Sequence, residues 1–142
     1  MSGTGHPFHR PAKFRVLIVE DEALVALEMH IVLASAGFDI VGVTSNLAGA
    51  IRLASTVSPQ LAIVDVNLAN GDSGVDVAAD LKTLGIPSLF ASGNCPTGPE
   101  KLIAIGCLQK PFDDQSLMRA VQTARASIEL GARSTAKEWR GS

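Results

Sequence analysis

Residues 61–68 read LAIVDVNL, so four apolar residues lead directly into the carboxylate of Asp65. Turn-forming residues follow between Asn70 and Gly74. A short apolar run that ends in turn residues is typical of a strand buried in a parallel sheet. We therefore expect Asp65 at the carboxyl end of such a strand, the edge at which open α/β sheets bind their ligands.

The chain on both sides of this run alternates between strand and helix patterns. The predicted strands cover residues 14–19, 39–44, 61–65, 87–91 and 106–109. In the first predicted helix, apolar residues fall at helical spacing at Leu24, Leu27, Ile31 and Ala34. This alternation predicts an α/β fold with a doubly wound, five-stranded parallel sheet. Right-handed crossovers restrict its topology, and of the two common strand orders we expect the flavodoxin-like order 2-1-3-4-5. Pro96, Gly98 and Pro99 predict that the fourth helix is short or irregular.

Length and composition indicate one ordinary globular domain, with 142 residues, 46% hydrophobic content and a formal charge of -2. We expect a flexible tail over residues 1–13, a folded domain over 14–130, and a polar tail that frays over 131–142. His6 and His9 in the first tail are not expected to form a metal site. No basic block, apolar span or signal sequence stands out, so we expect a cytoplasmic protein that binds neither nucleic acid nor membrane.

The two cysteines, Cys95 and Cys107, match no metal-binding spacing and no CxxC motif. We expect reduced thiols, as is usual in a cytoplasm. Cys107 is interpreted as a small residue of the buried core.

Polar residues follow four of the predicted strands, and the expected topology brings them to one edge of the sheet. They are Glu20, Asp21, Asp65, Ser92 and Lys110. Clustered carboxylates need a cation, and oxygen ligands of this kind favour Mg²⁺. A carboxylate can act as a nucleophile and form an aspartyl phosphate, whose charged oxygens an ammonium and a hydroxyl can stabilise.

Four motifs at these strand ends resemble those of the response-regulator receiver domain (CheY-like) of two-component signalling. They are VEDE at 19–22, VDVN at 64–67, ASG at 91–93 and QKPF at 109–112, within a resemblance that runs from about Phe14 to Leu130. The stretch LFASGN at 89–94 further resembles the Phe-Ala-Thr-Gly-Tyr ("FAT GUY") subgroup, which is found with alphaproteobacterial-type histidine kinases. Ser92 stands here in place of the Thr, and Asn94 in place of the Tyr.

The resemblance implies a role for each residue at this edge. Asp65 would accept the phosphoryl group, and Mg²⁺ would be held by Asp21, Asp65 and the backbone carbonyl of Asn67. Glu20 matches the first acid of the metal-binding pair and would act through water because its side chain is long. Ser92 would bond a phosphoryl oxygen, and Lys110 would pair with Asp65 before phosphorylation and with the phosphoryl group afterwards. The resemblance also implies a cis bond before Pro111.

The implied function is that of a single-domain response regulator in a phosphorelay. It is not an enzyme with a separate substrate, although it would assist its own phosphorylation and dephosphorylation. The phosphodonor would be a sensor histidine kinase or a histidine phosphotransfer protein. Because only residues 131–142 follow the domain, we expect no output domain, and the signal would pass to an unidentified downstream protein or end in a phosphate sink.

Two alternatives from other classes remain open. One is a pseudo-receiver that binds its partner without phosphorylation, which the departures at Glu20, Ser92 and Cys107 favour. The other is a small Mg²⁺-dependent phosphatase that uses an aspartyl phosphate. Asn67 counts against it, because such an enzyme would have a second Asp at that position.

The route by which a signal leaves this edge is expected to be unusual. Receivers commonly carry an aromatic ring three residues before the lysine, and that position is Cys107 here. We therefore expect residues 93–104 to be the mobile element, whose order changes on phosphorylation.

Overall fold

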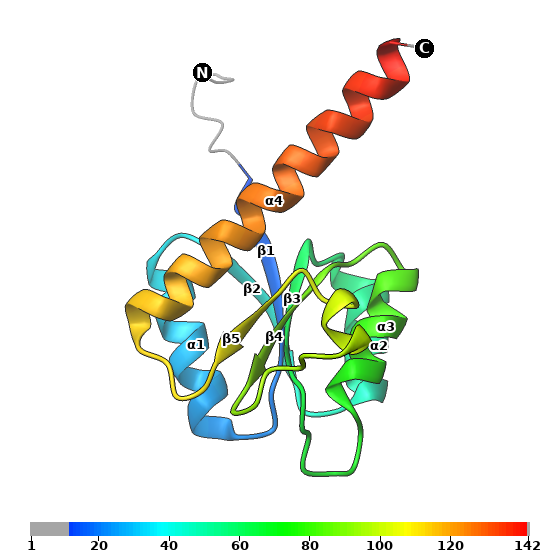
Figure 1. The fold of residues 1–142 in the computed structure, drawn as a ribbon. Helices are drawn as coiled ribbons and strands as arrows, with labels where there is room; N and C mark the ends of the chain where they lie inside the picture. The colour runs from blue at the N-terminus through cyan, green and yellow to red at the C-terminus, as the bar shows by residue number, and fades with distance from the viewer. Residues whose placement is uncertain (1–11, 142) are drawn as a thin grey trace.

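The computed structural model describes residues 12–141 and contains a five-stranded parallel sheet (Figure 1). Its order is β2-β1-β3-β4-β5, as the sequence predicts for a flavodoxin-like, CheY-like fold. The strands are β1 (Arg15–Val19), β2 (Asp39–Thr44), β3 (Leu61–Asp65), β4 (Ser88–Ser92) and β5 (Gly106–Gln109). From β1 the chain goes outward to β2 on one side, and from β3 it goes outward to β4 and β5 on the other side. The switch point of the sheet therefore lies between β1 and β3.

Helices cover both faces of the sheet. They are α1 (Ala23–Ser35), α2 (Leu47–Val57), α3 (Gly74–Thr83) and α4 (Asp114–Gly141). Helices α1 and α4 cover one face, and α2 and α3 cover the other (Figure 1). Between β4 and β5 the chain forms only a short 3₁₀ helix, η1 (Pro99–Leu102), which confirms the prediction of a short fourth helix.

The strands alternate between two buried clusters, as a period of two requires. In β1, Val16 and Ile18 face the cluster under α1 and α4, whereas Leu17 and Val19 face the cluster under α2 and α3. All five residues of β3 are buried, including Asp65. A strand buried on both faces is rigid, so its last residue has a well-defined position.

The apolar residues that the sequence places at helical spacing in α1 are not the buried ones. Ala26, Met29 and Leu33 face the core. Leu24, Leu27 and Ile31 are 81%, 53% and 56% exposed, respectively. Both sets have helical spacing, because this helix is apolar on more than one side, and the pattern alone cannot select the buried side.

Helix α4 continues to Gly141, past residue 130, after which we expect a polar tail from the sequence (Figure 1). Gly131 does not end the helix. One interior glycine costs only about 1 kcal/mol relative to alanine, and residues 132–140 include the good helix formers Ala, Arg, Lys and Glu. The tail expected at residues 1–13, with His6 and His9, lies almost entirely outside the described residues.

The prediction of reduced thiols is wrong. Cys95 and Cys107 form a disulfide, with their Cα atoms 6.1 Å apart. Cys107 is exposed and is absent from both buried clusters. The side chain of Cys107 faces out because β5 is an edge strand. The segment before β5 forms only the short helix η1, which leaves the outer side of this strand uncovered.

None of the helices within residues 12–141 combines the length and the apolar content that a bilayer crossing requires.

Candidate functional site

Three carboxylates meet where β1 and β3 end side by side. Val19 pairs with Val64 in the parallel register, so the residues that follow, Glu20 and Asp65, emerge next to each other. One oxygen from each of Glu20, Asp21 and Asp65 lies within 4.8 Å of the others. Glu20 and Asp65 are buried, and Asp21 is half-buried.

Lys110 brings one ammonium to this cluster from the end of β5. Its Nζ lies 2.8 Å from Oε1 of Glu20 and 3.4 Å from Oδ2 of Asp65. Oε1 of the exposed Glu22 is farther away, at 3.9 Å. The sequence predicted a pairing of Lys110 with Asp65, whereas the shorter contact is with Glu20.

The charges in this cluster shift two pKa values. Burial raises the pKa of Glu20 above its usual value, although the hydrogen bond from Lys110 opposes the rise. Burial alone would lower the pKa of Lys110, but its hydrogen bond with Glu20 and the negative charges of Glu20 and Asp65 outweigh that effect and raise it. The lysine is therefore held in its charged form.

Backbone N–H groups fix the orientation of each carboxylate. Glu22 donates its N–H to Oε2 of Glu20 at 3.1 Å, and Asn67 donates its N–H to Oδ1 of Asp65 at 3.0 Å. Ala69 donates its N–H to Oδ2 of Asp21 at 2.8 Å, which ties the loop after β3 to the loop after β1. The three side chains are therefore positioned in advance, as chemistry at this edge would require.

Gly74, at the start of α3, is a residue whose role the sequence analysis missed. Its N–H donates to the Val66 carbonyl at 2.8 Å, and a Cβ at this position would collide with the Asp65 carbonyl and lie 2.6 Å from Cα of Val66. A glycine is needed because α3 begins directly against the backbone of Asp65. The residue before it, Ser73, caps α3 by accepting a hydrogen bond from the Val75 N–H.

Ser92 ends β4 but its hydroxyl is engaged elsewhere. The hydroxyl donates to the Asn94 carbonyl and accepts from the Asn94 N–H, both at 3.0 Å. The structure thus brings Glu20, Asp21, Asp65 and Lys110 together, whereas Ser92 is buried and turned into its own loop. The Lys110–Pro111 bond is cis, as the resemblance implied.

The residues present fit a hard divalent cation. The donor set consists of carboxylate oxygens alone, which favours a hard ion over a soft one. Each carboxylate uses backbone N–H groups or Lys110 for part of its hydrogen-bonding capacity and keeps further lone pairs. Three carboxylates held against one ammonium leave the cluster with excess negative charge, so a cation is favoured there.

Comparison with known families agrees with this geometry. The response regulator receiver domain, defined as a family by its sequence pattern, matches residues 16–122. The chain belongs to the response regulator receiver family. This family is a signalling domain and not a family of catalytic enzymes.

Curated relatives of this receiver include two bacterial regulators. The phyllosphere-induced regulator PhyR of Methylorubrum extorquens is 36% identical over 116 residues, which cover 77% of this chain and 42% of PhyR. The transcriptional regulatory protein PdtaR of Mycobacterium tuberculosis is 31% identical over 115 residues, which cover 78% of this chain and 56% of PdtaR. The receiver thus spans about half the length of these relatives.

Solved structures of receiver domains are similar as well. The receiver domain of a modulated diguanylate cyclase from Desulfovibrio desulfuricans has a TM-score of 0.74 and 31% identity, covering 84% of this chain and 99% of that one. The receiver domain of PhyR from Erythrobacter litoralis has a TM-score of 0.70 and 28% identity, covering 79% and 89%.

Proposed function

We propose that this receiver accepts a phosphoryl group on Asp65 from a phosphohistidine, with Mg²⁺ bound beside it. The observation that carries the proposal is the buried Asp65 carboxylate. Its Oδ1 is fixed by the Asn67 N–H, and its Oδ2 lies 3.4 Å from a charged ammonium. A nucleophile that is fixed in position and faces a cation is arranged for attack on an anionic phosphoryl group.

The transfer is an exchange at phosphorus. An Asp65 oxygen forms a P–O bond while the P–N bond to the donor imidazole breaks. The imidazole nitrogen keeps the electron pair of the broken bond. When bound, Mg²⁺ supplies positive charge to the phosphoryl oxygens and to the carboxylates. Asp21 and Asp65 would hold it, with the Asn67 carbonyl as a further ligand and Glu20 acting through water.

Lys110 contributes a second positive charge at the same place. Its ammonium contacts both Glu20 and Asp65, so a small movement would let it pair with a phosphoryl oxygen on Asp65. The buried Glu20 keeps the ammonium in place before transfer.

The exposed side of α1 supports a protein as the phosphodonor. Leu24, Leu27 and Ile31 are exposed on the helix that begins two residues after Asp21. Leu27 also lines, with Glu20 and Asp21, a depression of about 540 Å³. An apolar helix face beside the acidic cluster is suited to a helix of a histidine kinase or a histidine phosphotransfer protein.

Membership of the receiver family supports the wider role. The chain would pass the signal in a cytoplasmic phosphorelay by binding a downstream protein, or would drain phosphate from a shared kinase. The LFASGN stretch at 89–94 supports membership of the FAT GUY subgroup. Its Leu89–Ala91 part lies in the buried strand β4, which leads directly to Ser92.

Acetyl phosphate with Mg²⁺, followed by intact mass measurement in native buffer, tests this function. We expect one phosphoryl group on the wild-type chain and none on Asp65→Asn. Asp76→Asn, an exposed acid in the first turn of α3, is the matched control and should be phosphorylated normally. Absence of phosphate from the wild type would instead favour the pseudo-receiver, and rapid turnover of many phosphate esters would favour the phosphatase.

A further inference from the structure

The Cys95–Cys107 disulfide joins the loop after β4 to the edge strand β5. Cys107 is exposed and Cys95 is half-exposed, so a thiol in solution has access to the bond. Neither cysteine belongs to a buried cluster. The bond therefore lies outside the core, and its opening removes no side chain from either buried cluster.

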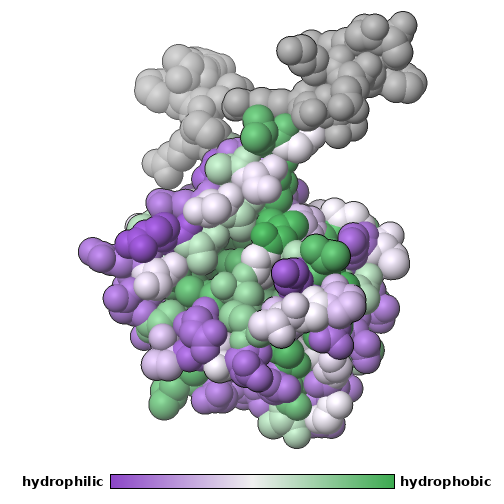
Figure 2. Space-filling view, viewed as in Figure 1, coloured by the Kyte–Doolittle hydropathy of each residue, from purple (hydrophilic) through white to green (hydrophobic). Residues whose placement is uncertain are grey.

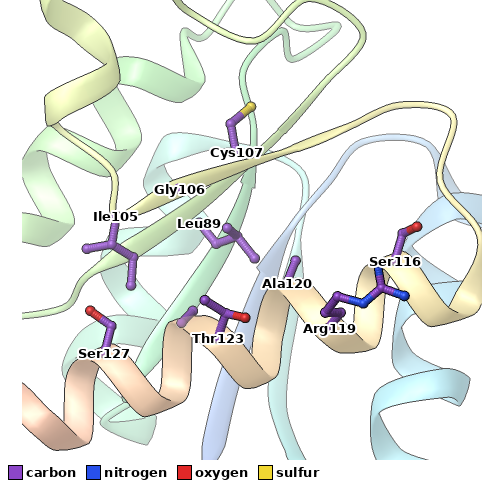
Figure 3. A pocket seen from close by; sticks show the side chains of 10 residues that line it. Leu89, Ile105, Gly106, Cys107, Ser116, Arg119, Ala120, Thr123 and Ser127 are labelled. Carbon is purple, nitrogen blue, oxygen red and sulfur yellow. The ribbon is translucent and has the colours of Figure 1, made fainter.

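Each cysteine of the bond lies close in the sequence to one residue of the candidate site. Cys95 comes three residues after Ser92, and Cys107 comes three residues before Lys110. In the sheet, Cys107 pairs with Phe90 and Gln109 pairs with Ser92. Cys107 lines the groove between β5 and α4, but in Figure 3 its sulfur points away from α4. The disulfide therefore links the loop between β4 and η1 to the side of β5 that faces away from α4.

This loop forms one wall of a depression next to the acceptor. The depression has a volume of about 500 Å³, and Asn94, Cys95 and Thr97 line it opposite Asn67 and Ser73. Asn67 holds Oδ1 of Asp65 through its N–H. Any movement of the loop therefore changes the space beside the phosphoryl site.

We propose that Cys95 and Cys107 form a reversible thiol–disulfide site that controls the mobility of residues 93–104 and, through it, the access of Ser92 to the phosphoryl group. The second half of this proposal rests on the proposed function. Ser92 can turn toward Asp65 only if both of its hydrogen bonds to Asn94 break. Asn94 is bonded to Cys95, so the closed disulfide restrains the residue that must move.

The redox step is an ordinary thiol–disulfide exchange with a dithiol. One thiolate of the dithiol attacks a sulfur of the Cys95–Cys107 bond, which breaks the bond and releases the other cysteine as a thiolate. The second thiolate of the dithiol then attacks its own sulfur in the mixed disulfide and releases the remaining cysteine. Two electrons and two protons pass to the receiver, which gains two thiols, while the dithiol becomes a cyclic disulfide. A small disulfide such as oxidised glutathione reverses the reaction and leaves as two thiols.

The exposed apolar surface beside the loop gives the freed segment somewhere to move. Leu102 in η1 is 73% exposed and Ile105 is 45% exposed. Figure 2 shows apolar surface between α4 and the η1 region of this face. Release of Cys95 from Cys107 therefore permits a rearrangement within residues 93–104 that buries more of this surface, while Ala104 stays in the buried cluster under α2 and α3.

The first test is whether the bond is reversible. The full chain is equilibrated in glutathione or dithiothreitol buffers of graded ratio, its thiols are trapped with N-ethylmaleimide, and its intact mass is measured. We expect a change between no adduct and two adducts across the series, the same in both directions. A chain that stays oxidised in excess dithiothreitol, or stays reduced in excess oxidised glutathione, would overturn the proposal.

The second test needs no phosphorylation. Amide exchange is compared in the oxidised wild type, the reduced wild type, Cys107→Ser and Cys95→Ser. We expect exchange over residues 93–104 to be about tenfold faster in the last three than in the oxidised chain, with β1 and β3 unchanged. Equal exchange in all four samples would show that the bond does not control the loop.

The third test joins the bond to the site. With acetyl phosphate and Mg²⁺, we expect the oxidised wild type to be phosphorylated about tenfold more slowly than the reduced wild type, because Ser92 cannot be positioned. In both buffers, Cys107→Ser should react as fast as the reduced wild type. Equal rates in both redox states overturn the coupling to Ser92. If no sample is phosphorylated, the proposed function and this coupling fail together, whereas the thiol trapping and amide exchange still decide whether the bond is reversible and controls the loop.

Discussion

Lys110 is one ammonium among several carboxylates, and the distances decide how it acts. It lies 2.8 Å from Glu20 and 3.4 Å from Asp65. A metal ion would be held by carboxylate oxygens, and none of its bonds would need an ammonium. The lysine can therefore serve the phosphoryl group without serving the metal.

For this reason Lys110→Ala should slow phosphorylation by acetyl phosphate by roughly a hundredfold, the usual effect of losing one charged donor to the transition state. Mg²⁺ affinity, measured by calorimetry, should stay equal or increase, because a positive charge has left the cluster. Lys82→Ala on α3 is the control for loss of an exposed lysine.

Because the substitution leaves Glu20 buried without its partner, the double variant Lys110→Ala/Glu20→Gln should be measured beside it. The double variant removes the unpaired charge and separates misfolding from lost function. A parallel loss of Mg²⁺ affinity and phosphorylation in a folded Lys110→Ala chain would contradict the role given to Lys110.

The positions of these residues at the strand ends were predictable from the sequence, whereas the directions of their side chains were not. Asp65 and Lys110 lie at the expected edge because strand ends are fixed by the apolar runs before them. The turn of Ser92 toward Asn94 depends on loop geometry that no spacing encodes. The pairing of Cys95 with Cys107 depends on the close approach of the loop to β5, so spacing could not reveal it.

At the scale of elements, α1 presents two apolar sides and the core uses one of them. Ala26, Met29 and Leu33 are buried by β1 and the neighbouring helix α4. Leu27 and Ile31 remain exposed on a helix close to the acidic cluster. An exposed apolar stripe in this position is best explained by a partner that covers it during transfer.

The double variant Leu27→Ser/Ile31→Ser should therefore lose at least about tenfold in transfer rate from a phosphorylated histidine phosphotransfer protein that reacts with the wild type. Its reaction with acetyl phosphate should be unchanged, because the small donor needs no docking surface. Both substitutions are exposed, so the free energy of unfolding should change by only about 0.5 kcal/mol per site.

Leu84→Ser removes an exposed leucine at the end of α3 and is the matched control. Equal rates with the protein donor for the control, the double variant and the wild type would show that the donor docks elsewhere. A parallel loss with acetyl phosphate would show damage to the site itself.

At the scale of the whole molecule, strand order brings the site together. Residues 20, 65 and 110 lie far apart in the chain. Glu20 and Asp65 meet because β1 and β3 are adjacent at the switch point, and the Lys110 side chain reaches them from the end of β5. Alternation of strand and helix patterns predicted the parallel sheet and reduced its strand order to two common solutions, one of which is the order found. It could not predict that α4 continues to Gly141, because a helix end at an exposed glycine depends on small differences in free energy.

The cost of gathering three carboxylates is shared by the whole fold, so the stability of the fold should report the cation. Mg²⁺ at ten times its dissociation constant should stabilise the folded chain by about 1.4 kcal/mol. This corresponds to a rise of about 3 to 6 °C in Tm for a domain of this size, measured against KCl of equal ionic strength.

Asp21→Asn should abolish that rise and increase the Tm of the metal-free chain. The amide removes one of three clustered negative charges, while its oxygen can still accept the Ala69 N–H. Asp80→Asn makes the same change at an exposed position of α3 and should keep the full Mg²⁺ response. If Mg²⁺ leaves the Tm of the wild type unmoved, or raises that of Asp21→Asn equally, these carboxylates do not hold the ion. The excess negative charge of the edge must then be balanced within the protein, by Lys110 and by the raised pKa of Glu20.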